Sequence, residues 1–168
     1  MVRAALETRG PVASNTNGDN MASGVITALM NAPSAPFAAL EVDEMHLPAV
    51  AGEVNPEVLV LLNLSRDQLD RVGEISSVEL RLRQAVEEHP NAIIVANCDD
   101  PLIVSAACSS SKVVWVAAGA GWGADSIAYP RGGQVLWENG TWRLVPAQPG
   151  GALPELCERP SPDWWLDD

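Results

Sequence analysis

The sequence predicts an α/β protein in which a parallel sheet is flanked by helices. The first observation is an unbroken apolar run at residues 58–62, Val-Leu-Val-Leu-Leu, without polar alternation. Such a run is typical of a strand that is buried on both faces of a parallel sheet. The second observation is that two similar runs, at 37–40 and 92–96, are separated from it by further segments of the chain, one of them with clear helical patterning. Strands that alternate with helices indicate parallel βαβ units.

The expected elements of the first 118 residues alternate regularly. A helix that begins near residue 2 ends at Gly10, because glycine readily adopts the conformation that closes a helix. Val25, Ile26 and Leu29 share one face of a second helix. In chain order we expect a helix at 2–9, a strand at 11–14, a polar loop at 15–20, a helix at 21–30, a strand at 37–40, a short helical or irregular piece to 54, a strand from 58, a helix at 76–88, a strand at 92–96, a helix at 101–108 and a strand at 113–117.

The pattern changes after residue 118. Glycines at 119, 121 and 123 indicate a connection, and three short strands are expected at 126–129, 134–137 and 141–145. Asn139-Gly140 predicts a hairpin between the last two, because this pair suits a type I′ turn. The tail from residue 146 is rich in Pro, Gly and Trp, and we expect it to lie extended over the sheet with Trp164 and Trp165 as packing residues. We therefore divide the chain into an α/β domain, 1–118, and a ribbon-like insertion with an extended tail, 119–168.

Acidic and amide side chains follow three of the expected strands. They are Glu41, Asp43 and Glu44 after the first, the charged segment 63–74 with Asp67 after the second, and the segment 97–100 after the third. Open α/β sheets bind ligands at the carboxyl ends of their strands, and Mg²⁺ is bound by carboxylates together with substrate phosphates. The pattern favours a magnesium nucleotide site. Two other interpretations stay open: a charged surface turn, and helix capping, for which Asp100 followed by Pro101 is suited.

These segments resemble the central domain of Mur ligases, and in particular the MurT branch. The resemblance is carried by Glu-Val-Asp-Glu at 41–44, by Asn-Leu-Ser-Arg-Asp-Gln-Leu-Asp-Arg-Val-Gly-Glu at 63–74, and by Asn-Cys-Asp-Asp-Pro at 97–101. Asn-Gly-Asp-Asn-Met at 17–21 with Gly24, and Arg-Pro-Ser-Pro-Asp-Trp at 159–164, are similar to further segments of that branch. The resemblance covers nearly the whole chain, and the segments follow one another in the same order as in that branch. Gln68 stands where other Mur ligases usually carry His.

The resemblance implies an ATP- and magnesium-dependent carbon–nitrogen ligase of cell-wall synthesis. It would amidate the D-glutamate α-carboxyl of lipid II through an acyl phosphate, with ammonia from a glutaminase subunit of the GatD type. The implied catalytic residues are Glu41 and Asp67. The implied candidates for magnesium ligands are Glu41, Asp43, Glu44 and Asp67. The implied substrate contacts are Asn15, Thr16, Asn17, Gly18 and Asn20, whose short polar side chains and glycine let a phosphate or sugar approach the backbone.

A phosphate loop of the expected kind is missing from the sequence. Mur ligases hold ATP with a Gly-rich loop that ends in Lys. Lys112 is the only lysine, and it precedes an expected strand. The segment 15–20 superficially imitates such a loop, but Asp19 would place a negative charge against the phosphates. We favour a chain that lacks the first strand and phosphate loop of the fold; a degenerate loop is the alternative. On either interpretation we expect the chain alone to be inactive.

The region after residue 118 predicts no zinc site. In the MurT branch, which the sequence resembles, this region often holds zinc through paired cysteines. Tyr129-Pro130-Arg131-Gly132 stands where a Cys-Pro-x-Cys pair would be expected, and Cys157 alone remains near the second pair. One thiolate cannot make a closed tetrahedral site.

Composition excludes several other classes of function. The 168 residues carry a net charge of −12, which disfavours nucleic acid and anionic membranes as partners. No apolar run approaches the roughly 20 residues of a membrane span, and the start does not look like a signal peptide. Three scattered cysteines fit reduced thiols. We therefore expect a cytoplasmic protein that meets the membrane only through its lipid-linked substrate.

Two functional alternatives to this ligase remain open. The chain could be a non-catalytic binding or scaffold module that keeps the sheet without the ATPase. It could also belong to a Mur ligase that adds an amino acid to a UDP-linked precursor.

Overall fold

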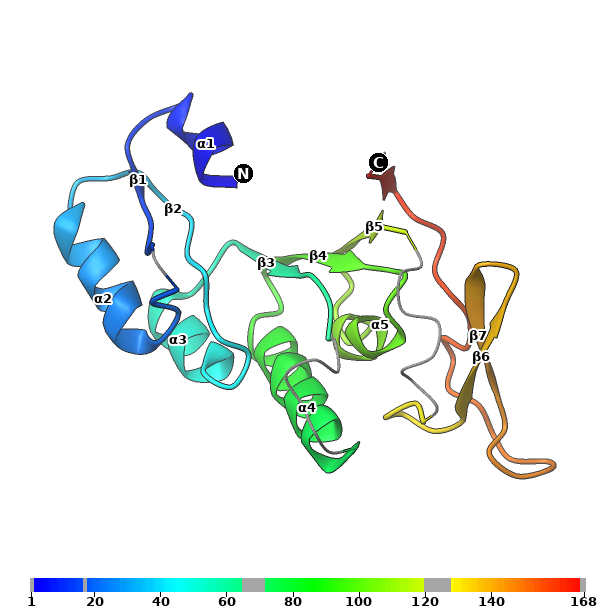
Figure 1. Ribbon diagram of the computed structural model, residues 1–168. Coiled ribbons are helices and arrows are strands. Elements are labelled where there is room, and N and C mark those ends of the chain that lie inside the picture. Colours follow the sequence, from blue (N-terminus) through cyan, green and yellow to red (C-terminus); the bar gives the residue numbers. More distant parts are fainter. Residues whose placement is uncertain (1, 17, 65–71, 120–127, 167–168) are drawn as a thin grey trace. The chain divides into compact units, whose positions relative to one another are not determined.

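The computed structural model describes residues 2–16, 18–64, 72–119 and 128–166 (Figure 1). The chain forms two compact units, Met1–Glu53 and Val54–Asp168. Among the described residues, no helix is long and apolar enough to cross a membrane.

The first unit contains a small parallel sheet. Its two strands, β1 (Val12–Ala13) and β2 (Phe37–Ala38), pair in parallel, with Val12 opposite Phe37. The helices are α1 (Val2–Glu7), α2 (Ala22–Asn31) and α3 (Leu47–Val54). Small apolar side chains fill its core: Ala13, Val25, Ala28, Val50 and Ala51.

Gly24 allows the loop after β1 to approach α2 closely. A Cβ atom built on Gly24 would collide with the backbone oxygen and the side chain of Asp19. Any larger residue would therefore push the loop and the helix apart. This close approach gives a physical reason for the glycine at this position.

The second unit contains a four-stranded sheet in the order β3-β4-β5-β8, with all neighbours parallel. Helices α4 (Val72–Glu88) and α5 (Pro101–Ala107) lie together on one face of this sheet (Figure 1). The predicted α/β fold with a parallel sheet and flanking helices is confirmed. The strands are β3 (Val58–Leu61), β4 (Ile93–Asn97), β5 (Val113–Ala117) and β8 (Trp164–Trp165).

Strand β3 is not buried on both faces, so that expectation was wrong. Leu59 and Leu61 are buried, whereas Val58 and Val60 are 47% and 48% exposed. The buried and exposed residues alternate along the strand. An unbroken apolar run is compatible with burial of both faces of the strand. It does not show whether other elements cover one face or both.

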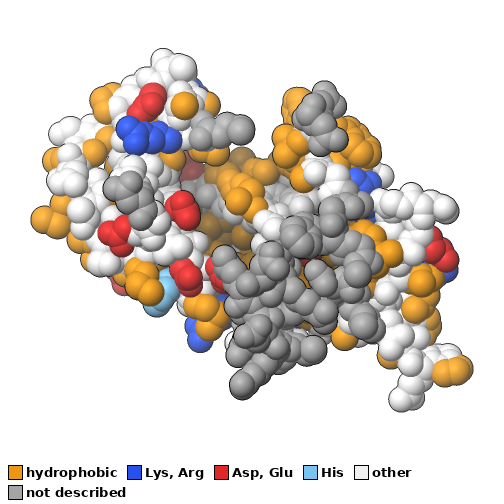
Figure 2. Space-filling model, viewed as in Figure 1, with side chains coloured by type: hydrophobic (Ala, Val, Ile, Leu, Met, Phe, Trp, Pro, Cys, Tyr) orange, Lys and Arg blue, Asp and Glu red, His pale blue; other side chains and the backbone are white. Residues whose placement is uncertain are grey.

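The tail joins the edge of the sheet instead of lying over it. The N–H of Asp163 donates to the Trp115 oxygen at 2.8 Å, and the Trp115 N–H donates to the Asp163 carboxylate, also at 2.8 Å. Strand β8 then pairs with β5. Trp164 and Trp165 are 68% and 66% exposed, and their role as packing residues stays a prediction; hydrophobic atoms are visible on the surface at this end of the chain (Figure 2).

A separate antiparallel sheet follows residue 128. Strands β6 (Gln134–Glu138) and β7 (Thr141–Val145) form the predicted hairpin. Asn139 and Gly140 have φ angles of 52° and 75°, as a type I′ turn requires. The expected third strand is reduced to a single bridge between Ala128 and Gln134, and residues 126 and 127 lie outside the described residues. The expected boundary at 118/119 remains a prediction.

Candidate functional site

In the first unit, the loops that follow β1 and β2 are joined by one side chain. Asn15 follows β1, and its amide nitrogen donates to the Glu41 carbonyl oxygen at 2.7 Å. The Glu41 N–H donates to the Asn15 amide oxygen at 2.9 Å. The Asn15 nitrogen also donates to the Asp19 carbonyl oxygen at 2.7 Å. These bonds connect the loop 15–20 to Glu41 in the loop after β2, and both loops lie at the carboxyl ends of their strands.

The acidic segment after β2 offers an exposed carboxylate at Glu41. Glu41 is exposed, and none of the hydrogen bonds among the described residues involves its carboxylate. Asp43 is half-buried, and one of its carboxylate oxygens accepts the Met45 N–H at 2.9 Å. The Asp43 N–H donates to the Asn20 oxygen at 2.9 Å, which is a second link between the two loops. Several acidic side chains are visible on the surface of this unit (Figure 2).

Three of the predicted magnesium ligands, Glu41, Asp43 and Glu44, lie in one segment after β2. Within the described residues, no three His, Cys, Asp or Glu side chains gather into a metal-binding group. Mg²⁺ needs only one or two carboxylates when phosphates and waters complete its shell, so the oxygen donors of Glu41 and Asp43 still fit this ion. Asp67, Gln68 and Asn17 lie outside the described residues. The role of Asp67 as a magnesium ligand together with Glu41 therefore remains a prediction.

The expected substrate loop is exposed for most of its length. Thr16 and Gly18 are exposed, and Asn20 is half-buried. Gly18 has a φ of 73°, a conformation that glycine adopts without strain. Asn15 differs from these residues, because its amide is already hydrogen-bonded within the unit.

In the second unit, Asp100 caps helix α5. Its carboxylate accepts the N–H groups of Leu102 at 2.8 Å and Ile103 at 3.3 Å. The other oxygen accepts the Leu64 N–H at 2.7 Å and so anchors the backbone shortly after β3. Burial raises the pKa of Asp100 above its usual value, although these three N–H groups lower it. The capping interpretation is confirmed for this carboxylate.

Asp99 is also engaged in structural contacts. It is buried, and its carboxylate pairs with the Arg159 Nε at 2.5 Å. The other oxygen accepts the N–H groups of Ala118 and Gly119, both at 2.8 Å. Arg159 in turn lies over the Trp165 ring, 5.3 Å from its centroid. Asp99 thus connects the ends of β4 and β5 to the tail, and it is not free to act as a metal ligand.

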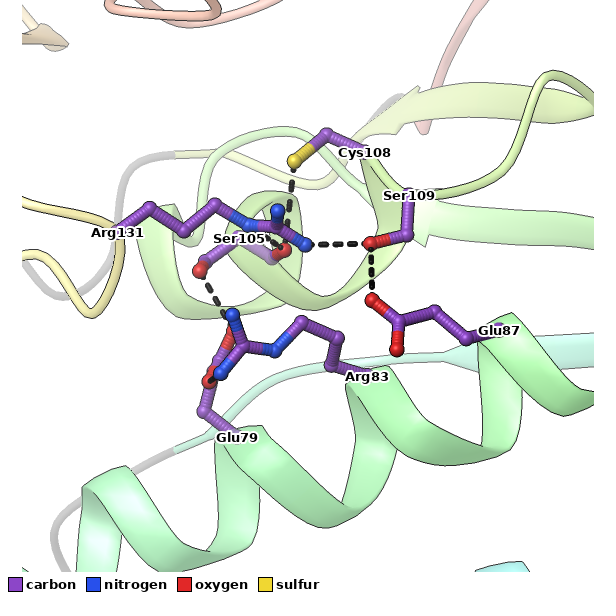
Figure 3. A network of polar contacts seen from close by, with 7 residues as sticks. All are labelled: Glu79, Arg83, Glu87, Ser105, Cys108, Ser109 and Arg131. Carbon is purple, nitrogen blue, oxygen red and sulfur yellow. Dashed lines mark hydrogen bonds and ion pairs between the residues drawn. The ribbon is translucent and has the colours of Figure 1, made fainter. Parts of the chain in front are cut away.

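A buried polar network connects helices α4 and α5 (Figure 3). Glu79 on α4 is fully buried, and its carboxylate accepts the Ser105 hydroxyl at 2.6 Å. Its second oxygen lies 3.4 Å from the Arg83 guanidinium. Sequence reasoning did not find this site, because its partner on α5 lies 26 residues further along the chain.

Arg131 attaches the segment before β6 to this network. Its Nε donates to the Ser105 carbonyl oxygen at 2.8 Å, and its Nη2 donates to the Ser109 hydroxyl at 2.6 Å (Figure 3). Tyr129 is buried and packs on Trp142, with ring centroids 6.2 Å apart. At the positions where the resembling family often carries a cysteine pair, this chain therefore uses an aromatic contact and a guanidinium. Its freedom from zinc stays a prediction.

Residues 1–140 match the model of the Mur ligase middle domain. The chain belongs to the Mur ligase family. The matched residues include the parallel strands β1 to β5, whereas β8 lies beyond them.

Curated relatives of this Mur ligase chain belong to the MurT branch, as the residues suggested. This chain is 35% identical over 100 residues to the lipid II isoglutaminyl synthase (glutamine-hydrolyzing) subunit MurT of Streptococcus pneumoniae (strain ATCC BAA-255 / R6). The match covers 57% of this chain and 22% of the relative. This chain is 32% identical over 103 residues to the MurT subunit of Staphylococcus aureus (strain COL), covering 60% of this chain and 23% of that protein. The chain thus covers less than a quarter of the length of these relatives.

Proposed function

We propose that this Mur ligase chain serves an ATP-dependent ligase that amidates the D-glutamate α-carboxyl of lipid II in peptidoglycan synthesis. The observation that carries the proposal is its similarity to MurT subunits, whose names describe a glutamine-hydrolysing lipid II isoglutaminyl synthase. A glutaminase subunit of the GatD type would supply the ammonia. The reaction belongs in the cytoplasm, at the inner face of the membrane, where a lipid-linked substrate is within reach.

The proposed reaction has two balanced steps. A carboxylate oxygen of the substrate attacks the γ-phosphorus of ATP, and the bond to ADP breaks. Ammonia then attacks the carbonyl carbon of the acyl phosphate, phosphate leaves, and the nitrogen loses a proton to form the amide. Stabilising the charge on the transferred phosphoryl group is the main task of such a site.

Glu41 is the residue that we assign to the metal. Its carboxylate is exposed at the end of β2 and is not engaged by described residues, whereas one oxygen of Asp43 is already bonded to Met45. Asp43, Glu44 and Asp67 are the further candidates. Bound Mg²⁺ would neutralise phosphate charge, which a chain of net charge −12 with a single lysine does not do alone.

One observation favours a second candidate, a non-catalytic module of the same fold. The ammonium of Lys112 donates to the Asn91 oxygen at 3.1 Å. Lys112 directly precedes β5, so it lies at the amino end of the sheet, opposite the carboxyl ends where ligands bind. The described part of the chain therefore offers no lysine for the phosphates.

The test is an amidation assay with lipid II, Mg-ATP and glutamine. The full-length gene product that contains this chain is expressed with its glutaminase partner. Glutamine-dependent formation of the amide supports the proposal. Addition of an amino acid to a soluble UDP-linked precursor would show that the branch assignment is wrong, and absence of any ligase activity would favour the non-catalytic module.

A further inference from the structure

We propose that Asn15 is a positioning residue that fixes the backbone of Glu41, so that the Glu41 carboxylate is presented to the metal in a set geometry. This inference rests on the proposed function, because it takes Glu41 as the magnesium ligand. It differs from the sequence-based expectation that Asn15 touches the substrate directly.

Both donors of the Asn15 amide are used inside the unit. A side-chain amide has two N–H donors and one carbonyl acceptor. Both donor bonds of Asn15 go to carbonyl oxygens, those of Asp19 and Glu41, and its oxygen accepts the Glu41 N–H. A group with these bonds has little left to offer a substrate, but it controls where Glu41 lies.

The pair of bonds to Glu41 continues the strand pairing with a side chain. Strands β1 and β2 end at Ala13 and Ala38, and one more backbone bond follows, from the Ala39 N–H to the Ala13 oxygen at 2.9 Å. Backbone pairing ends there. At Glu41 the side-chain amide of Asn15 takes the place of a neighbouring strand, because it offers the same donor and acceptor as a peptide group. Glu41 is thereby held although it lies beyond the sheet.

The loop that carries Asn15 is itself anchored. Gly24 lets Asp19 pack tightly on α2, and the Asp43 N–H donates to the Asn20 oxygen at 2.9 Å. The acidic segment is therefore attached to the loop 15–20 at two points, Glu41 and Asp43. A fixed backbone with an exposed carboxylate that no described residue engages is the arrangement that a preorganised metal ligand needs.

The first arm of the test measures the attachment itself by amide hydrogen exchange in NMR spectra of the full 168-residue chain. We expect a protected Glu41 amide, and exchange about tenfold faster in Asn15→Ala, since one hydrogen-bond acceptor is lost. Asn15→Asp keeps an acceptor oxygen and should retain part of the protection. Asn31→Ala, an exposed asparagine at the end of α2, is the matched control and should leave the Glu41 amide unchanged.

The second arm uses Mn²⁺ as a probe in place of Mg²⁺. Paramagnetic broadening by substoichiometric Mn²⁺ is compared at the amides around Glu41 and around Glu53, an exposed carboxylate of the same unit. We expect stronger broadening at Glu41 in the wild type and in Asn31→Ala, and loss of that preference in Asn15→Ala.

The two arms separate the possible failures. A Glu41 amide that exchanges as fast in the wild type as an unstructured peptide would overturn the attachment by Asn15. Lost protection in Asn15→Ala with unchanged Mn²⁺ preference would overturn the positioning role and leave the metal assignment intact. No Mn²⁺ preference at Glu41 in the wild type would overturn the magnesium assignment and the positioning role with it, while protection by Asn15 would stand.

Discussion

Removal of one partner of the ion pair between Asp99 and Arg159 is expected to destabilise the second unit strongly. The side chains are 6% and 15% exposed, and the Nε–Oδ1 distance is 2.5 Å. Removing one partner of a buried pair leaves a buried charge and typically costs about 3–5 kcal/mol. Because Asp99 keeps the N–H groups of Ala118 and Gly119, we expect the lower end, about 3 kcal/mol, for Arg159→Ala.

Arg143→Ala is the matched control for this variant. Arg143 pairs with Glu138 at 3.1 Å, but these side chains are 49% and 51% exposed. Exposed pairs contribute at most about 1 kcal/mol. Urea denaturation of both variants gives the two changes in unfolding free energy. Exchange at the Leu166 amide, which donates to the Ala117 oxygen at 2.9 Å, shows whether β8 detaches. Equal destabilisation by the two substitutions, with Leu166 still protected, would refute this reasoning.

Three further predictions follow from other contacts. Asp100→Ala should lower the unfolding free energy by about 1–2 kcal/mol through loss of the α5 cap, whereas Asp100→Asn should cost less because it keeps an acceptor oxygen; equal losses in urea denaturation would contradict the capping role. Burial raises the pKa of Cys98 to about 11 from an ordinary 9.0, so the unfolded chain loses this proton at a lower pH than the folded chain. The free energy of unfolding should therefore fall as pH rises from about 9 to 11, and the fall should be smaller in Cys98→Ala. The same pH profile in both proteins would contradict this prediction. The chain alone should not bind Mg-ATP tightly, because Lys112 lies at the amino end of the sheet, and micromolar affinity in isothermal titration would revive the degenerate phosphate loop.

Features that depend on nearby residues could be predicted from the sequence. The Asn139-Gly140 turn and the Asp100 cap each involve residues that are neighbours in the chain, and both are confirmed. Strand β4 was expected at 92–96 and occurs at Ile93–Asn97, because its apolar run is flanked by turn residues. Local chemistry was sufficient in these cases.

Features that depend on distant residues could not be predicted in the same way. The sequence left Asp99 open as a ligand or a structural residue, and the deciding partner, Arg159, lies 60 residues away. Asn15 stays a predicted substrate contact, and the sequence cannot show that its amide is hydrogen-bonded to Glu41, 26 residues later. The exposed face of β3 and the edge position of β8 depend on which elements pack against the sheet and which strands pair. An apolar pattern in the sequence does not contain that information.

The most direct test of the central claim traces nitrogen from glutamine. The full-length ligase and its glutaminase are incubated with lipid II, Mg-ATP and glutamine labelled with ¹⁵N at the side-chain amide, and the product is analysed by mass spectrometry. We expect the label in the α-carboxamide of D-glutamate with the wild type and with Glu53→Gln, and little or none with Glu41→Gln. Label transfer that is unaffected by Glu41→Gln would contradict the assignment of Glu41, and no transfer by the wild type would contradict the proposed function.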